Sequence, residues 1–249
     1  MSKKNRFKRK HILSIVIGLS LVGVLLFVSF RERHFSPDFD IIELKKINTI
    51  NGIDISRYQA HINWEKVAPQ IDFVFIRATS GKRYVDPLFE EHYSNAKDKN
   101  VPIGVYHYFI FHQNGLEQAQ HFLQTLGNNE FELPLVVDVE EHPTYGPASF
   151  NQKKTVENLK SFIETIEKAT KKKMIIYTNI ECFDKYIKRN FPTQHLWICT
   201  FKGKQSLPSK WLFWQTTHTG KIRGIKGHVD INVFNGNRKA WESFIGLKI

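Results

Sequence analysis

Short hydrophobic runs rich in β-branched residues recur between residues 52 and 234, and they alternate with longer segments of helical spacing. In the segment 151–171, apolar side chains return every three or four residues, which is typical of one face of an amphipathic helix. Strands that alternate with helices predict a parallel sheet covered by helices, the α/β class.

Eight of these runs are predicted as strands: Gly52–Ser56, Phe73–Ala78, Ile103–Phe109, Leu135–Glu140, Met174–Thr178, Leu196–Cys199, Trp211–Thr216 and Val229–Phe234. Helices are predicted over 86–99, 116–126 and 151–171, with a terminal helix reaching about Phe244. Eight strands suggest a closed (β/α) barrel, and 249 residues suit one. The connections 199–211 and 217–228 are short and rich in Gly and Lys, so we expect an irregular barrel.

One uncharged apolar stretch, residues 12–30, precedes the alternating pattern. At the helical rise it spans roughly 28 Å, close to the hydrocarbon thickness of a bilayer. A cleaved signal peptide is the alternative, but the stretch exceeds a usual signal core and no small-x-small cleavage site follows it. We therefore expect an uncleaved transmembrane helix.

The first ten residues carry six Lys or Arg, half of the formal net charge of +12. Such a cluster stays on the cytoplasmic side, which predicts a single-pass membrane protein with the bulk of the chain, after the apolar stretch, outside the cytoplasm. Residues 1–11 then form a basic tail, 12–30 the anchor, 31–49 a stalk and 50–249 the barrel. The remaining basic balance suits a polyanionic surface such as a cell wall; no nucleic-acid-binding motif accompanies it.

Cys182 and Cys199 are the two cysteines of the chain, too few for a disulfide scaffold and without metal-ligand spacing. We expect them to pack in the core, while a single disulfide stays open. His107 and His142 have no convincing set of partner ligands, so neither a metal nor another cofactor is expected.

The strand Leu135–Glu140 ends in two carboxylates two residues apart. Side chains alternate along a strand, so Asp138 and Glu140 point to one face and Val137 and Val139 to the other. Two neighbouring carboxyl groups repel, and burial of one raises its pKa, which leaves a proton donor beside a standing charge. Glycosidic bond cleavage needs that combination.

Two more carboxylates lie on strands that should end at the same mouth of the barrel, Asp54 on the first and Asp230 on the last. Side chains able to bind sugar rings or hydroxyl groups accompany them: Tyr106, Tyr108, Tyr177, Trp214 and Gln215. The set predicts a carbohydrate-binding cleft with acidic catalysts.

Five ordered segments resemble signature blocks of glycoside hydrolase family 25, the N-acetylmuramidase lysozymes: Gly52–Ser56, Arg77–Gly81, Gly104–Phe109, Leu135–Glu140 and Gly224–Asn232. The resemblance implies an irregular β/α barrel that cleaves the β-1,4 bond between N-acetylmuramic acid and N-acetylglucosamine in peptidoglycan glycan strands. Two departures, Ser80 and the pair Cys199–Thr200, lie near the expected cleft and concern substrate preference.

By this resemblance Glu140 is the general acid, and Asp54, Asp138 and Asp230 are its acidic partners. Asp138 would stabilise the oxocarbenium-like charge or orient the substrate acetamido group. Attack by that acetamido group would retain the anomeric configuration, and activation of water by a carboxylate would invert it. The catalytic domain is expected to be monomeric.

Two other functions remain as alternatives. One is a non-catalytic glycan-binding module on the same barrel, although all four carboxylates are present. The other is a metal-dependent peptidoglycan hydrolase or deacetylase that uses Asp138 and Glu140 with a histidine.

Overall fold

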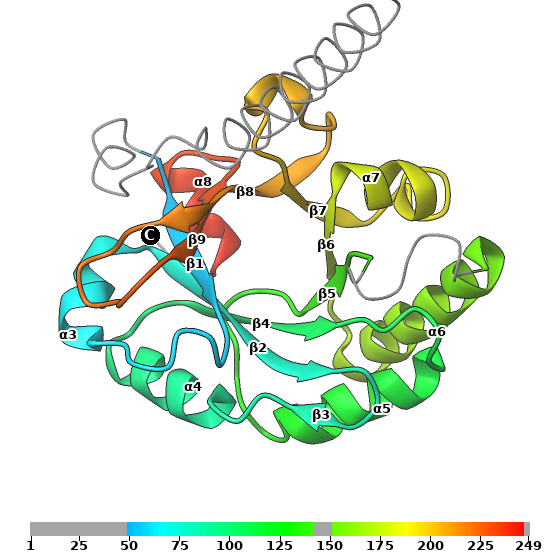
Figure 1. Ribbon diagram of the computed structural model, residues 1–249, viewed down its shortest axis with the longest axis horizontal. Helices are drawn as coiled ribbons and strands as arrows, with labels where there is room; N and C mark the ends of the chain where they lie inside the picture. The colour runs from blue at the N-terminus through cyan, green and yellow to red at the C-terminus, as the bar shows by residue number, and fades with distance from the viewer. Residues whose placement is uncertain (1–48, 142–150, 247–249) are drawn as a thin grey trace, which may run out of the picture. The chain divides into compact units, whose positions relative to one another are not determined.

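The computed structural model describes residues 49–141 and 151–246, and within them nine strands form one sheet in the order β1-β9-β8-β7-β6-β5-β4-β2-β3 (Figure 1). Pairing of β1 with β2 closes eight of these strands into a barrel, and β3 extends the sheet beyond β2. The strands are β1 (Asn51–Ile55), β2 (Phe73–Ser80), β3 (Tyr84–Val85), β4 (Ile103–Tyr108), β5 (Val136–Val139), β6 (Ile175–Asn179), β7 (His195–Cys199), β8 (Trp211–Gly220) and β9 (Val229–Phe234). The predicted eight-stranded barrel is confirmed.

The long helices are α4 (Phe89–Asp98), α5 (Gly115–Leu126) and α6 (Gln152–Thr170), outside β2, β4 and β5 (Figure 1). Shorter helical elements are α3 (Trp64–Val67), η1 (Ala68–Gln70), α7 (Ile180–Cys182), η3 (Phe183–Ile187), η4 (Lys204–Ser206) and α8 (Arg238–Phe244). The four predicted helices are confirmed. The expected irregularity is confirmed too, because the described connection from β7 to β8 contains only the short turn η4.

The strand β9 corrects the prediction of a parallel sheet. It runs antiparallel to both of its neighbours, β8 and β1, while the other barrel pairs are parallel. The reason is the length of the connection 221–228, since a parallel return needs a crossover of a dozen or more residues. A connection this short can only reverse the chain into a hairpin.

Predictions for the N-terminal part mostly fall outside the described residues: the tail 1–11, the anchor 12–30 and the stalk up to residue 48. Within 49–141 and 151–246, no helix combines the length and apolarity needed to cross a bilayer. Both cysteines are free, Cys182 buried and Cys199 half-buried, so the disulfide that the sequence left open is not formed.

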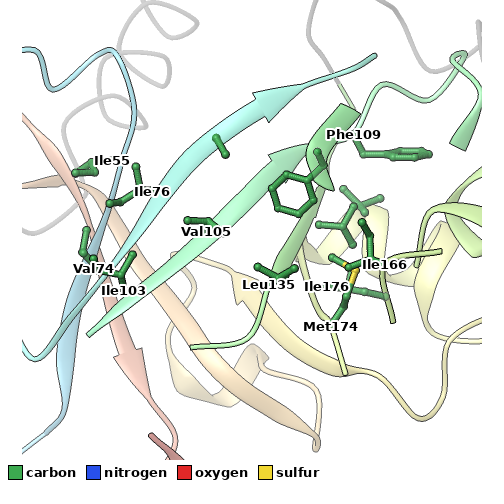
Figure 2. Packing of buried hydrophobic residues seen from close by; sticks show 14 of the residues in the cluster. Ile55, Val74, Ile76, Ile103, Val105, Phe109, Leu135, Ile166, Met174 and Ile176 are labelled. Atoms are coloured by element: carbon green, nitrogen blue, oxygen red, sulfur yellow. The ribbon is translucent and has the colours of Figure 1, made fainter. Parts of the chain in front are cut away.

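Strand alternation divides the hydrophobic core into two layers. Outward-facing residues such as Val74, Ile76 and Ile176 belong to a cluster that also contains residues of the helices. Figure 2 shows members of this cluster from β1, β2, β4 and β6, together with Ile166 of α6. The inward-facing residues form a second, largely aromatic cluster with Phe73, Phe75, Trp197, Phe213 and Trp241 among its members. Because successive side chains of a strand point to opposite faces, the same strands contribute residues to both layers.

The aromatic cluster fills the barrel interior. Phe75 on β2 and Trp197 on β7 are not on neighbouring strands, yet their rings stack with centroids 4.5 Å apart, so they meet across the barrel. Trp241 of α8 extends the cluster, with its ring centroid 5.2 Å from Phe73 and 5.1 Å from Phe234. This packing supports the polar residues that lie farther along the same inward faces.

Gly104 on β4 leaves the space that Phe75 occupies, because a Cβ there would lie 2.2 Å from the ring. We therefore expect Gly104→Ala to destabilise the fold by about 1–3 kcal/mol through overpacking. The loss of unfolded-chain entropy favours alanine by only about 0.4–1 kcal/mol, so the clash decides the sign. Urea unfolding measures the change. Ser94→Ala on the exposed face of α4 is the control, and an unchanged unfolding free energy for Gly104→Ala would contradict this packing.

Candidate active site

A cavity of about 730 Å³ opens where the parallel barrel strands end. All eight barrel strands contribute lining residues. The eighth, β9, contributes Asp230, and the other seven strands and the loops that follow them contribute Asp54, Ser56, Tyr58, Arg77, Ser80, Tyr106, Tyr108, Ile110, Asp138, Glu140, Tyr177, Trp197, Cys199, Phe201, Gln215 and His218. Many of these residues face the barrel interior from the ends of the strands, next to the aromatic cluster, to which Tyr177 and Trp197 themselves belong.

All four predicted carboxylates lie in this cavity. Asp54 is on β1, Asp138 is on β5, and Glu140 directly follows β5. Asp230 reaches the same mouth because β9 is antiparallel, so its first residues lie beside the last residues of β1; Asp54 and Asp230 are register partners. Because β9 is reversed, Asp230 reaches the cavity from the amino end of its strand, whereas the other three carboxylates lie towards the carboxyl ends of theirs.

Asp54 is held by two amides. Asn232 Nδ2 donates to Asp54 Oδ2 at 2.8 Å, and Gln215 Nε2 donates to the same oxygen at 3.0 Å. Each amide is oriented by another donor: Trp197 Nε1 to Asn232 Oδ1 at 2.9 Å, and Tyr177 Oη to Gln215 Oε1 at 3.1 Å. Because both amide oxygens are occupied, both NH₂ groups must face Asp54.

Asp54 and Asp230 share a proton asymmetrically. Burial raises the pKa of Asp54, but the hydrogen bonds from Asn232, Gln215 and Asp230 oppose that rise. Burial and the negative charge of Asp54 raise the pKa of Asp230 to about 9. At neutral pH Asp230 therefore stays protonated, and its carboxyl O–H donates a hydrogen bond to the Asp54 carboxylate.

Asp138 and Glu140 are desolvated too, and no residue of 49–141 or 151–246 is seen to donate a side-chain hydrogen bond to them as the amides do to Asp54. Burial and the charge of Glu140 raise the pKa of Asp138 well above its usual range, and its Oδ1 is buried with no hydrogen-bond partner among these residues. Burial, reinforced by the charge of Asp54, raises the pKa of Glu140 to about 7. Glu140 can thus give up or take a proton near neutral pH beside the standing charge of Asp54.

Of the predicted sugar-binding side chains, Tyr106, Tyr108, Tyr177 and Gln215 line the cavity. Trp214 does not, and its prediction is corrected: as the neighbour of Gln215 on β8 it points to the opposite face of the strand. Its indole Nε1 donates to Thr200 O at 2.9 Å, and its ring packs on Trp211.

Several site residues received no role from the sequence: Tyr58, Arg77, Trp197, Phe201, His218 and Asn232. Strand alternation could have found some of them, because Arg77 lies two residues after Phe75 and Asn232 lies two residues after Asp230. Arg77 is bound to the buried carboxylate of Asp86, with Nε and Nη2 each 2.7 Å from Oδ2.

Histidine does not contribute to a metal centre among the described residues, where no group of three or more His, Cys, Asp or Glu has a suitable arrangement. His107 Nδ1 lies 2.7 Å from Thr79 Oγ1 and its Nε2 lies 3.2 Å from Gln118 Oε1. Burial lowers the pKa of His107 to about 3, which keeps it neutral. His142 lies outside the described residues.

Comparison with known proteins gives concordant similarities. Residues 53–225 match the profile of the family described as glycosyl hydrolases family 25. The protein YegX of Escherichia coli K12 is 34% identical over 209 residues, 80% of this chain and 75% of YegX. Lysozyme M1 of Streptomyces globisporus is 30% identical over 218 residues, 81% of this chain and 73% of the lysozyme.

A solved structure shows the same architecture. The family 25 glycosyl hydrolase from Bacillus anthracis superposes with a TM-score of 0.74 at 34% identity, covering 79% of this chain and 94% of the other.

The link between Asp54 and Glu140 is testable by titration. Replacing Asp54 with Asn removes the negative charge that raises the pKa of Glu140, so this pKa should fall from about 7, though not to its ordinary value, because burial persists. NMR of ¹³C-labelled glutamate carboxyls measures it. Glu141→Gln is the control, since Glu141 binds Lys185 and Tyr186 instead. An unchanged Glu140 pKa in Asp54→Asn would refute the coupling.

Proposed function

The chain belongs to glycosyl hydrolases family 25 and is a glycoside hydrolase of the lysozyme type, and from this we propose that it hydrolyses the β-1,4 bond between N-acetylmuramic acid and N-acetylglucosamine in peptidoglycan, with Glu140 as general acid. The observation that carries the proposal is a cavity-lining carboxyl group whose pKa is raised to about 7 beside three further carboxyl groups.

Glu140 protonates the glycosidic oxygen as the bond breaks, a step typically worth about 10²–10⁴-fold in rate. Desolvation is what keeps the proton on this carboxyl group at neutral pH. In the same cavity Asp54 remains the standing negative charge, because two amides and the proton of Asp230 stabilise its ionised form. That charge opposes the positive charge that develops on the sugar ring.

Asp138 orients the substrate acetamido group in this proposal. Its Oδ1 is buried in the cavity wall and accepts no hydrogen bond from the part of the chain that the structure describes, and an acetamido N–H is a donor of the right kind. An acceptor left unpaired in a buried site is costly until the substrate supplies the donor. This role favours attack by the acetamido oxygen and retention of the anomeric configuration over activation of water.

We further propose that residues 12–30 form an uncleaved transmembrane helix that places the barrel, 50–249, outside the cytoplasm on the stalk 31–49. The support is the length and apolarity of the stretch and the six positive charges before it. A tether of this kind would direct cleavage to wall close to the cell's own membrane.

Glu140→Gln in the full-length protein should lower hydrolysis of purified peptidoglycan at least a hundredfold while leaving the fold intact, because glutamine has no proton to give. Mass spectrometry of the released fragments should identify muramic acid at the new reducing ends. Glu141→Gln, next in the sequence and bound to Lys185 and Tyr186, should retain activity. Full activity of Glu140→Gln would exclude the acid, and loss of wild-type activity with EDTA would favour a metal-dependent hydrolase.

The pH dependence follows from the sign of the pKa change. The acid must be protonated to act, so kcat/KM should fall as the pH rises through about 7. The same raised pKa means that the folded state holds the proton better than the unfolded chain does. Glu140→Gln should therefore gain stability relative to the wild type as the pH rises from about 4.5 to about 7, which chemical denaturation at several pH values can measure.

The anchor predicts that the full-length protein stays in the membrane fraction after alkaline extraction with its first residues intact. Replacing both Leu21 and Val24 with Arg should release it, because each central arginine costs about 2.5–3.5 kcal/mol of insertion free energy. A soluble wild-type protein whose N-terminus begins after residue 30 would instead identify a cleaved signal peptide.

A further inference from the structure

Two exposed aromatic side chains border the catalytic cavity. Within residues 49–141 and 151–246, the large hydrophobic side chains that remain exposed are Tyr58, Val85, Leu116 and Phe201. The two aromatic ones, Tyr58 at 70% and Phe201 at 47% exposure, are also the two that line the cavity. Exposed apolar surface concentrated at an opening indicates a binding surface rather than a packing residue.

Tyr58 is fixed in place although it is exposed. The guanidinium carbon of Arg57 lies 5.0 Å from the centre of its ring and that of Arg77 lies 5.5 Å away, both within cation–π range. Arg57 Nη2 also donates to Tyr58 Oη at 3.3 Å. Arg77 is itself bound to the buried Asp86. The ring is therefore pre-positioned, so little side-chain entropy is lost when a ligand covers it.

Phe201 is supported from another element. It lies two residues beyond the end of β7, and its ring packs on that of His218 from β8 with centroids 4.7 Å apart. Around the barrel, β9 and β8 lie between β1, which leads to Tyr58, and β7, which leads to Phe201. The two rings thus enter the cavity from well-separated parts of its rim.

We propose that Tyr58 and Phe201 are stacking platforms for two sugar rings of one glycan strand, one on either side of the bond that Glu140 cleaves. This inference rests on the proposed function and extends it to a specificity for long strands. A pyranose ring presents a flat face of C–H groups that an aromatic ring can cover, while its hydroxyl groups stay hydrated at the edge. Tyr177, by contrast, is buried and hydrogen-bonded to Gln215, so it exposes far less ring surface than Tyr58 or Phe201.

The full-length Glu140→Gln protein, titrated with β-1,4-linked N-acetylglucosamine oligomers of three and six sugars, tests the platforms without turnover. Tyr58→Ala and Phe201→Ala should each weaken hexamer binding about tenfold, equivalent to about 1.4 kcal/mol. The proposed specificity for long strands requires that a trimer reach no more than one of the two rings, so trimer binding should respond to no more than one of the two substitutions.

Matched controls separate stacking from other effects. Tyr58→Phe and Phe201→Tyr keep the rings and should bind the hexamer within twofold of the parent. Leu116→Ala removes a comparably exposed apolar side chain that does not line the cavity, and it should change nothing. With Glu140 restored, Tyr58→Ala and Phe201→Ala should raise KM for peptidoglycan while kcat stays within twofold, because stacking would stabilise the bound substrate and the transition state alike.

Three results would overturn the platforms: no hexamer binding by the parent protein, a change below twofold for both alanine variants with unaltered unfolding midpoints, or an equal loss of trimer and hexamer binding in both. Failure of the proposed acid gives a different result. Activity would then survive in Glu140→Gln, while the binding differences among the Tyr58 and Phe201 variants would stand.

Discussion

Desolvation of four carboxyl groups in one cavity is the constraint on which the site depends. Among the described residues that line the cavity, Arg77 is the single Lys or Arg, and its guanidinium is bound to Asp86, outside the carboxylate group. The four carboxyl groups therefore cannot all ionise, and protons take the place of missing cations. Asp230, with a pKa of about 9, and Glu140, with a pKa of about 7, are two of the groups that hold these protons.

Which carboxyl group is ionised depends on the orientation of neutral side chains. Asp54 holds the charge because two amides donate to the same oxygen, and those amides cannot turn since Trp197 and Tyr177 occupy their oxygens. Trp197 is in turn stacked on Phe75 in the aromatic interior. The packing of the barrel thus determines which carboxyl group remains ionised, and reorganisation during a reaction is kept small.

Periodicity predicted much of this arrangement. The eight barrel strands, the long helices and the common face of Asp138 and Glu140 follow from the spacing of apolar residues. The direction of β9 did not, because it depends on a hairpin that the alternating pattern does not reveal, and yet this reversal delivers Asp230 to the mouth. Trp214 was assigned by residue type, although its neighbour Gln215 already occupied the inward face.

The residues that sequence reasoning missed divide into two kinds with different physical origins. Arg77, Trp197 and Asn232 are inward strand positions, recoverable in principle by extending the alternation from Phe75, Cys199 and Asp230. Tyr58 and Phe201 lie in loops after β1 and β7, where no period applies and where only the folded structure reveals that an aromatic ring is exposed. Three of the four carboxyl groups and both amides lie on strands, and Glu140 directly follows β5, whereas the exposed rings lie in loops. Loops tolerate sequence change far better than a packed interior does, so the glycan surface that this barrel accepts can change without disturbing the proton balance among its carboxyl groups.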